Sequence, residues 1–466
     1  MKKITLLFLL GFLAFSQLFA QSYPRGAVLD DALYNSLPRK APQLTRSLLT
    51  LPKSASLKQY APHVGNQGHY GTCTAWATAY AARTISESIV LNRLDKSLTT
   101  GNVFSPVFIY KSISDDSSCR SGTAISHALN VMKDPGVPRR SSAEQSSDFK
   151  LVQLSTYLQS ARFPIADYVI LYNYWRGQTG NEAARVQAVK KSLSEGKPVI
   201  IGMNTPASFN NAKSPWAPLE NSGISYGGHA MCVVGYDDNM HGGAFEILNS
   251  WGEDWGEQGY IWIPYNTFAQ FANQAYELIE NLHNYNDATL YSGFVYIEVD
   301  GSDKGMPVRF DESGYYKTAN AWPSGTRFRF IMGNNHPAYV YAFTADSSTS
   351  EINLIFPLAE FNESPILDYS QNMVAWPGEN DWIQMDDVKG TDYLVVLYSK
   401  QEQDIDSIMA RFATAAGTFP QRVASAVGSD YISHSNIKYV KSNIRFNCSM
   451  LNKQAVMGLL LAIDHK

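Results

Sequence analysis

The chain is poor in cysteine, in charge of one sign and in metal-ligand patterns, and each shortage excludes a class of protein. Four cysteines occur in 466 residues, so we expect no disulfide scaffold. Lys and Arg number 38 against 42 Asp and Glu, and no basic block predicts binding to nucleic acid. Histidine and cysteine do not recur at the spacing of metal ligands, and we expect neither a metal nor an organic cofactor.

Long apolar runs are also scarce. Met1-Lys2-Lys3 is followed by an apolar run over residues 4–15, and Leu18-Phe19-Ala20 offers a cleavage point. That run is short for a bilayer, so we expect residues 1–20 to be a signal peptide. The mature protein is then exported to the periplasm, the cell surface or the medium, without a membrane span. The later apolar stretch 455–463 predicts a buried strand.

The length of the chain predicts more than one hydrophobic core. Residues 21–54 are polar and irregular, which is typical of an N-terminal extension or a short pro-segment. Residues 55–287 alternate between helical and strand patterns, whereas residues 288–466 are mainly strand-like. We therefore predict an α+β domain followed by a mainly β accessory domain. The expected helices span 73–83, 182–193 and 403–412; expected strands include 199–202, 230–236, 244–248, 259–263, 294–299, 327–331, 339–343 and 393–398.

Cys73 is the first candidate functional residue. It follows a Gly-rich stretch, GNQGHYGT over residues 65–72, and opens the predicted helix. The N-terminus of a helix carries partial positive charge and free N–H groups, which favour a thiolate over a thiol. The same N–H groups can bind an oxyanion, and Gln67 lies close enough in sequence to donate a second hydrogen bond. These residues predict a nucleophile beside an oxyanion hole.

A histidine and an asparagine form the second part of the pattern. His229 stands at the start of an apolar strand, in GGHAMCVVGY over residues 227–236, and Asn249 begins the string Asn-Ser-Trp-Gly. An asparagine carbonyl can accept a hydrogen bond from one ring nitrogen of histidine, which leaves the other nitrogen for Cys73. Trp251 is placed to cover that hydrogen bond and exclude water. The combination predicts a Cys–His–Asn triad.

The motifs together resemble the papain family of cysteine peptidases, over roughly residues 54–280. Gln-Gly, Gly-Thr-Cys, Gly-His-Ala and Asn-Ser-Trp-Gly follow one another in the order of that family. The resemblance implies a two-lobed α+β fold, hydrolysis of peptide bonds in a protein or peptide substrate, and a thioester acyl-enzyme. It implies catalytic roles for Cys73, His229, Asn249 and Gln67.

The resemblance also implies a shielding role for Trp251 and places Gly122 and Gly228 at the substrate cleft. Some positions depart from the family pattern. Tyr70 stands where the family has a cysteine that pairs with the equivalent of Cys119, so the family's disulfide is not predicted. Thr74 follows the nucleophile, where the family has an aromatic residue.

Other functions fit the same sequence. An exported binding or adhesion protein would keep the peptidase fold without turnover, and a transpeptidase would use the same triad on an amine acceptor. The C-terminal half resembles, more weakly, a bacterial domain of unknown function often attached to exported or signalling proteins. The similar segments are 325–330, 338–341, 354–357 and 392–397. The sequence leaves open whether this half is a spacer or a binding domain, and it does not indicate an oligomeric state.

Overall fold

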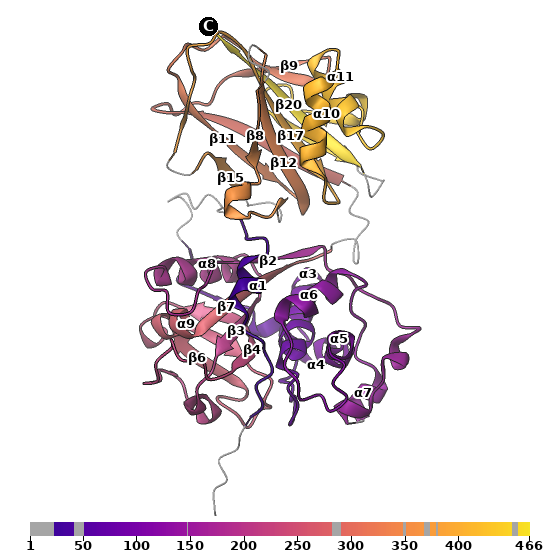
Figure 1. Ribbon diagram of the computed structural model, residues 1–466, viewed down its shortest axis with the longest axis vertical. Helices are drawn as coiled ribbons and strands as arrows, with labels where there is room; N and C mark the ends of the chain where they lie inside the picture. Colours follow the sequence, from indigo (N-terminus) through magenta and orange to yellow (C-terminus); the bar gives the residue numbers. More distant parts are fainter. Residues whose placement is uncertain are drawn as a thin grey trace, which may run out of the picture.

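The protein consists of two bodies stacked along its long axis (Figure 1). The predicted signal peptide, residues 1–20, and the predicted boundary at residues 287 and 288 lie outside the described part of the chain. The computed structural model describes residues 23–41, 51–146, 148–281, 290–347, 351–367, 373–378, 381–449 and 455–466.

One half of the first body is helical and surrounds a continuous helical run that begins at Cys73. The run comprises α2 (Cys73–Ala75), the π-helical segment η2 (Trp76–Arg83) and α3 (Thr84–Val90). Every side chain of η2 is buried, as its alanine-rich sequence predicts. Its last residue, Arg83, forms an ion pair with Glu280 at 3.0 Å. The surrounding helices are α4 (Lys96–Gly101), α5 (Pro106–Ile113), α6 (Ile125–Lys133) and α7 (Ser142–Ser146).

The other half of this body is an antiparallel sheet with the order β2-β7-β3-β4-β5-β6, and β1 pairs with β4. The central strand β4 begins at Gly228. His229 is its second residue, and its pairing with Met203 of β3 fixes its backbone. The helices α8 (Glu182–Ser194) and α9 (Tyr265–Phe271) pack against the sheet. The strands are β1 (Ser54–Ser56), β2 (Asp167–Ile170), β3 (Val199–Asn204), β4 (Gly228–Asp237), β5 (Ala244–Leu248), β6 (Tyr260–Pro264) and β7 (Ala272–Ile279).

The second body is mainly β, as predicted. One sheet has the order β13-β12-β17-β20-β10-β9 with β14 on β12, and the other β15-β11-β8-β19-β18 with β16 on β11. The strands are β8 (Leu290–Val299), β9 (Val308–Asp311), β10 (Tyr315–Thr318), β11 (Arg327–Asn334), β12 (Ala338–Asp346), β13 (Ile352–Phe356), β14 (Ile366–Leu367), β15 (Met373–Trp376), β16 (Ile383–Gln384), β17 (Gly390–Ser399), β18 (Ile437–Tyr439), β19 (Arg445–Ser449) and β20 (Val456–His465).

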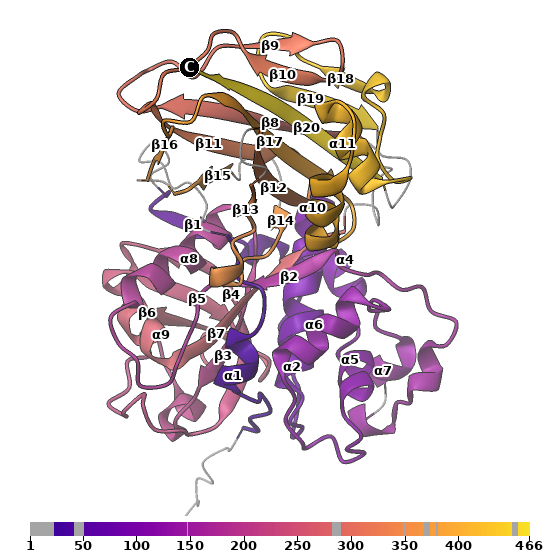
Figure 2. The same ribbon diagram turned by 45° about the horizontal axis from the view of Figure 1, so that its top comes forward.

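The second body carries one helix more than the sequence analysis predicted. The expected helix is α10 (Ile405–Thr414), and α11 (Phe419–Val427) follows it. The local signal for α11 was present in the sequence: Thr418 and Gln421 form a capping box, and Pro420 stands in the first turn. Both helices pack on the sheet that contains β12 and β17 (Figure 2).

The two bodies share buried contacts. Val169 of β2 and Ile279 of β7 belong to one apolar cluster with Tyr341 and Phe343 of β12. The Tyr339 hydroxyl donates to the Asp167 carboxylate at 2.9 Å. The second body therefore lies against the edge of the first sheet, at β2 and β7.

Residues 23–41, which we call the strap, connect both bodies. The strap contains one short helix, α1 (Asp31–Asn35), and runs along the first body between its helices and its sheet (Figure 2). At its C-terminal end the strap lies between the bodies. The Lys40 N–H donates to the Ile170 carbonyl at 2.8 Å, and the Arg39 N–H donates to the Asn362 carbonyl at 2.8 Å. Ala41 belongs to the buried core of the second body.

Candidate active site

Cys73 lies at the start of the helical run and faces the sheet. Its side chain is fully buried. Its Sγ accepts two backbone N–H groups, from Ala230 at 3.4 Å and from Gly26 of the strap at 3.3 Å. Because Ala230 directly follows His229, the thiol lies beside the candidate histidine, at the junction of the two halves. The structure thus brings together Cys73 and His229, which are 156 positions apart in the sequence.

His229 is oriented by Asn249. Its Nε2 lies 2.7 Å from Asn249 Oδ1, which also accepts the Ser250 N–H at 2.8 Å. An oxygen that accepts from Ser250 and faces Nε2 assigns the ring proton to Nε2 in the neutral tautomer. Nδ1 then carries the lone pair, and it has no hydrogen-bond partner within the described residues. This arrangement leaves Nδ1 available as a base.

Trp251 covers the histidine. The two rings stack with centroids 4.4 Å apart and an angle of 28° between their planes. Trp251 is almost completely buried, because Tyr23 of the strap stacks on it at 4.4 Å and Phe209 meets it edge-on at 5.6 Å. The stacked rings and the burial of Trp251 cover the hydrogen bond between His229 and Asn249 on this side.

Gln67 lies in the same site and is held from both ends. Its carbonyl oxygen accepts the Ser250 hydroxyl at 2.7 Å, and its amide donates to the Tyr70 carbonyl at 2.8 Å. The amide also faces the Pro24 carbonyl of the strap at 3.4 Å. The Pro24 carbonyl oxygen thus lies next to the Gln67 amide, the group expected to donate to the oxyanion. Ser250, which orients Gln67, was not singled out in the sequence, although it lies within the Asn-Ser-Trp-Gly string.

The strap fills the space between Gly122 and Gly228. The Ala27 N–H donates to the Gly228 carbonyl at 3.0 Å on one side, and the Thr123 N–H donates to the Gly26 carbonyl at 2.9 Å on the other. A Cβ on Gly228 would lie 2.1 Å from the Ala27 oxygen, and a Cβ on Gly122 would lie 3.2 Å from the Gly26 oxygen. Both glycines therefore line a groove that is wide enough for one extended chain.

Gly26 passes directly over the thiol. A Cβ at this position would lie 1.9 Å from the Gly71 carbonyl oxygen, so only glycine fits. The strap presents the Gly26 amide hydrogen to Sγ at 3.3 Å. Sequence reasoning missed Gly26, and its only local signal was a glycine in a polar stretch.

Burial under the strap favours the uncharged forms of Cys73 and His229. Burial raises the pKa of the Cys73 thiol, against the N–H groups of Ala230 and Gly26, which lower it. Burial lowers the pKa of His229 to about 3; the bond to Asn249 opposes this shift and the Arg25 charge adds to it. A thiol and a neutral imidazole are thus favoured under the strap.

This burial predicts acid sensitivity. In the unfolded chain His229 binds a proton below its ordinary pKa of 6.5. In the folded, covered state its pKa is about 3, so it stays neutral until the pH is much lower. Stability therefore falls as the pH drops from 6.5, by at most about 1.4 kcal/mol per pH unit from this group. Urea unfolding between about pH 6.5 and pH 4.5 will show a steeper loss for the wild-type protein than for His229→Gln. Equal slopes would contradict the prediction.

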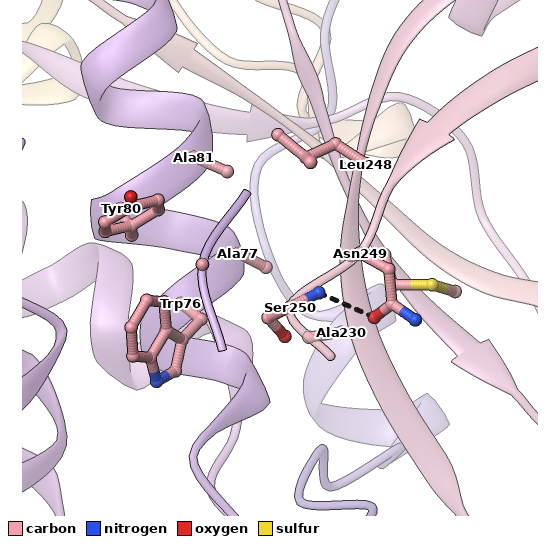
Figure 3. Close-up of a pocket in the computed structure, with 10 residues that line it drawn as sticks. Trp76, Ala77, Tyr80, Ala81, Ala230, Leu248, Asn249 and Ser250 are labelled. Carbon is pink, nitrogen blue, oxygen red and sulfur yellow. Dashed lines mark hydrogen bonds between the residues drawn. The ribbon is translucent and has the colours of Figure 1, made fainter. Parts of the chain in front are cut away.

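A small pocket lies next to Asn249 and Ser250. Figure 3 shows it between the helical run and the sheet, with Asn249 and Ser250 on one side and Trp76 and Tyr80 on the other. Neither Cys73 nor His229 lines this pocket. Its walls are mostly apolar, and the pocket is separate from the groove that the strap fills. Within the described residues, no group of His, Cys, Asp or Glu is arranged to hold a metal, and all four cysteines are free.

Comparison with known families decides what this body is. Residues 51–279 match the family described as papain family cysteine protease. They form a papain-family cysteine protease domain. The match covers the candidate residues Gln67, Cys73, His229 and Asn249, and it ends before the second body. The protease domain is therefore a cysteine-type peptidase fold, as the sequence resemblance implied.

Curated relatives of the protease domain are distant. An uncharacterized peptidase C1-like protein of Acanthamoeba polyphaga mimivirus is 27% identical over 242 residues, which are 49% of this chain and 72% of that protein. Gamete and mating-type specific protein A of Dictyostelium discoideum is 28% identical, over 47% of this chain and 44% of its own length. Cathepsin J of Mus musculus is 29% identical, over 44% of this chain and 57% of its own length. The chain thus spans about half the length of each of the last two relatives.

Solved structures similar to the chain include cysteine proteases. Xylellain, a cysteine protease from Xylella fastidiosa, matches with 23% identity and a TM-score of 0.40, over 56% of this chain and 97% of that one. A procathepsin B from Trypanosoma congolense matches with 15% identity and a TM-score of 0.44, over 55% of this chain and 87% of that one.

Among the described residues, no helix combines the length and apolar character that crossing a membrane requires.

Proposed function

We propose that this protein is an exported cysteine peptidase that hydrolyses peptide bonds with Cys73, His229 and Asn249. The observation that carries the proposal is the buried bond between His229 and Asn249, covered by Trp251 and adjacent to a thiol at the start of a helix. Each part has a role in the papain family to which the domain belongs. Export rests on the N-terminal sequence alone.

The proposed reaction proceeds in two steps. Cys73 transfers its proton to His229, and the thiolate attacks the substrate carbonyl carbon, whose electrons move to oxygen. The Cys73 N–H and the Gln67 amide stabilise that oxyanion. When the oxyanion collapses, the C–N bond breaks and His229 protonates the leaving amine. Water, deprotonated by His229, then attacks the thioester, which releases the acid and returns the thiol.

A digest of a peptide library tests hydrolysis directly. Cleavage at defined bonds, with a carboxylate on each N-terminal product, supports the peptidase. A transpeptidase would instead convert that product to an amide when an amine acceptor is added. A binding protein without turnover would leave the library intact. Mass spectrometry of the products distinguishes the three.

We further propose that the strap is the short pro-segment expected within residues 21–54. It covers Sγ, places a carbonyl at Gln67 and stacks Tyr23 on Trp251, so a substrate has no access to the triad. All proposed catalytic residues lie in the first body. We therefore also propose the division of the chain into a peptidase domain, residues 55–287, and an accessory domain, residues 288–466.

Gly26→Ala tests the strap within the full chain. Its Cβ would overlap the Gly71 carbonyl, which is backbone and cannot move aside, so the strap must lift from the thiol. We expect peptide cleavage to rise by about 10- to 100-fold, which corresponds to roughly 1.4–2.7 kcal/mol of lost strap binding. Gly101→Ala is a matched control, since no atom lies within 4 Å of its added Cβ. Unchanged activity in Gly26→Ala would show that the strap does not inhibit.

A further inference from the structure

A polar subsite lies beside the triad and holds the side chain of Arg25. The Arg25 Nε donates to the Thr205 carbonyl at 2.9 Å and to the Thr205 hydroxyl at 2.8 Å. Its Nη2 donates to the Pro206 carbonyl at 2.9 Å and to the Asn210 side-chain oxygen at 3.1 Å. The four oxygens are neutral and converge on one guanidinium.

The sequence around the subsite explains its shape. Thr205 and Pro206 follow directly after β3, and the 3-10 turn η5 (Ala207–Asn211) then returns Asn210 toward them. The Thr205 N–H is held by the Gly227 carbonyl at 3.0 Å, and Thr205 is fully buried. A Cβ on Gly227 would lie 3.0 Å from Arg25 Cδ, so glycine leaves room for the arginine stem. The acceptors are therefore part of a rigid wall.

The subsite lies next to His229 and Trp251. Phe209, in the same turn, lies 6.4 Å from the ring of His229 and 5.6 Å from that of Trp251. The Arg25 charge is close enough to His229 to lower its pKa. In the proposed reaction His229 protonates the leaving nitrogen, so the residue after the scissile bond lies next to this wall.

We infer that, once the strap is displaced, Thr205, Pro206 and Asn210 bind the guanidinium of a substrate arginine directly after the scissile bond. The inference rests on the proposed peptidase function. A planar guanidinium reaches acceptors on all three residues through two different nitrogens, which the single ammonium of lysine cannot reproduce. Arginine is therefore favoured over lysine, and lysine over an uncharged side chain.

The test uses matched peptides in the full-length Gly26→Ala background. Arginine, lysine or norleucine is placed after the scissile bond, or arginine before it, and kcat/KM is measured for each. We expect arginine after the bond to exceed norleucine by about tenfold or more, the scale of a hydrogen bond to a charged group. Equal rates, or a preference for arginine only before the bond, would overturn the inference and leave the peptidase proposal standing. If no peptide is cleaved, both proposals fail.

Variants of Asn210 separate recognition from folding. Asn210→Leu removes one acceptor at similar size and should lower the ratio of arginine to norleucine cleavage. Asn210→Asp adds a charge to the same position and should raise the arginine preference several-fold. A gain of selectivity cannot result from misfolding. An arginine preference that neither variant changes would overturn the assignment.

A second, independent observation concerns the other end of the strap. The Asn362 side chain donates to the Leu37 carbonyl at 2.8 Å and to the Ser36 carbonyl at 3.1 Å. The Arg39 carbonyl accepts the Ser364 N–H at 2.8 Å, and the Arg39 guanidinium lies 5.7 Å from the ring of Phe361. Residues 361–364 of the second body thus form a docking surface for the strap.

We propose that residues 361–364 hold the strap in the groove, so that the accessory domain strengthens the inhibition. This proposal also rests on the peptidase function. Asn362 adopts a left-handed conformation, with φ of 49°, which aspartate tolerates as well. Asn362→Asp keeps the side-chain shape but replaces two donor bonds with repulsion between oxygens.

The expected result is a several-fold rise in peptide cleavage by full-length Asn362→Asp, with Asn436→Asp, an exposed asparagine, as the control. In the Gly26→Ala background, where the strap has already lifted, Asn362→Asp should change nothing further. That non-additivity is specific to the strap, since a merely structural effect would appear in both backgrounds. No rise in the otherwise wild-type chain, or an equal rise in both, would overturn the proposal.

Discussion

Cys73→Ala will abolish peptide cleavage and lower kcat by about 10⁶-fold, the scale for loss of a triad nucleophile. The effect is large because the Cys73 Sγ meets the Ala230 N–H directly after His229, whereas the other three cysteines, Cys119, Cys232 and Cys448, are buried elsewhere. The measurement is turnover of the library peptides by the Gly26→Ala enzyme with and without Cys73→Ala. Cys448→Ala is the matched control and should retain full activity.

Thiol labelling adds an independent readout of the same residue. Because the strap covers Sγ and burial raises the pKa of the Cys73 thiol, iodoacetamide should label wild-type protein slowly and Gly26→Ala quickly. Loss of activity should follow modification of Cys73 in proportion. Turnover that survives complete modification would show that another group is the nucleophile.

Gln67→Ala will lower kcat by roughly 10²–10³-fold with KM much less changed, the usual cost of one oxyanion donor. The charge that Gln67 would contact exists only in the transition state, so ground-state binding of substrate is largely unaffected. Steady-state kinetics in the Gly26→Ala background measures both parameters. A rise in KM at constant kcat would place Gln67 in substrate binding instead.

Two variants refine the Gln67 result. Gln67→Glu has nearly the same shape but loses the N–H donor, so it should be at least as damaging as alanine. Ser250→Ala removes the hydroxyl that holds the Gln67 carbonyl at 2.7 Å and should cost less, because the donor remains but is less well oriented. If Gln67→Glu retains full activity, the amide is not the oxyanion donor.

The sequence by itself determined the candidate residues of the site and the family of the domain. Gln67, Cys73, His229 and Asn249 each stand in a short string whose local chemistry suggests a role, and their order along the chain matches one family. Periodicity also predicted strands next to two of them, 230–236 after His229 and 244–248 before Asn249. The expected strand 244–248 coincides with β5, and the expected helix 182–193 coincides with α8 within one residue. These features are local, so a reader of the sequence can find them.

Only the tertiary structure decided what covers the site. The strap has no periodic pattern, and its contacts join Gly26 to Cys73, 47 residues away, and Asn362 to Leu37, 325 residues away. In each bond the strap contributes a backbone group, which every residue carries, so the side chains of the strap do not reveal it. The same burial favours the uncharged forms of Cys73 and His229, whereas the sequence alone indicated a thiolate at the N-terminus of the helix. These pKa shifts result from burial, and burial depends on how the whole chain packs, so a short segment of sequence does not reveal it.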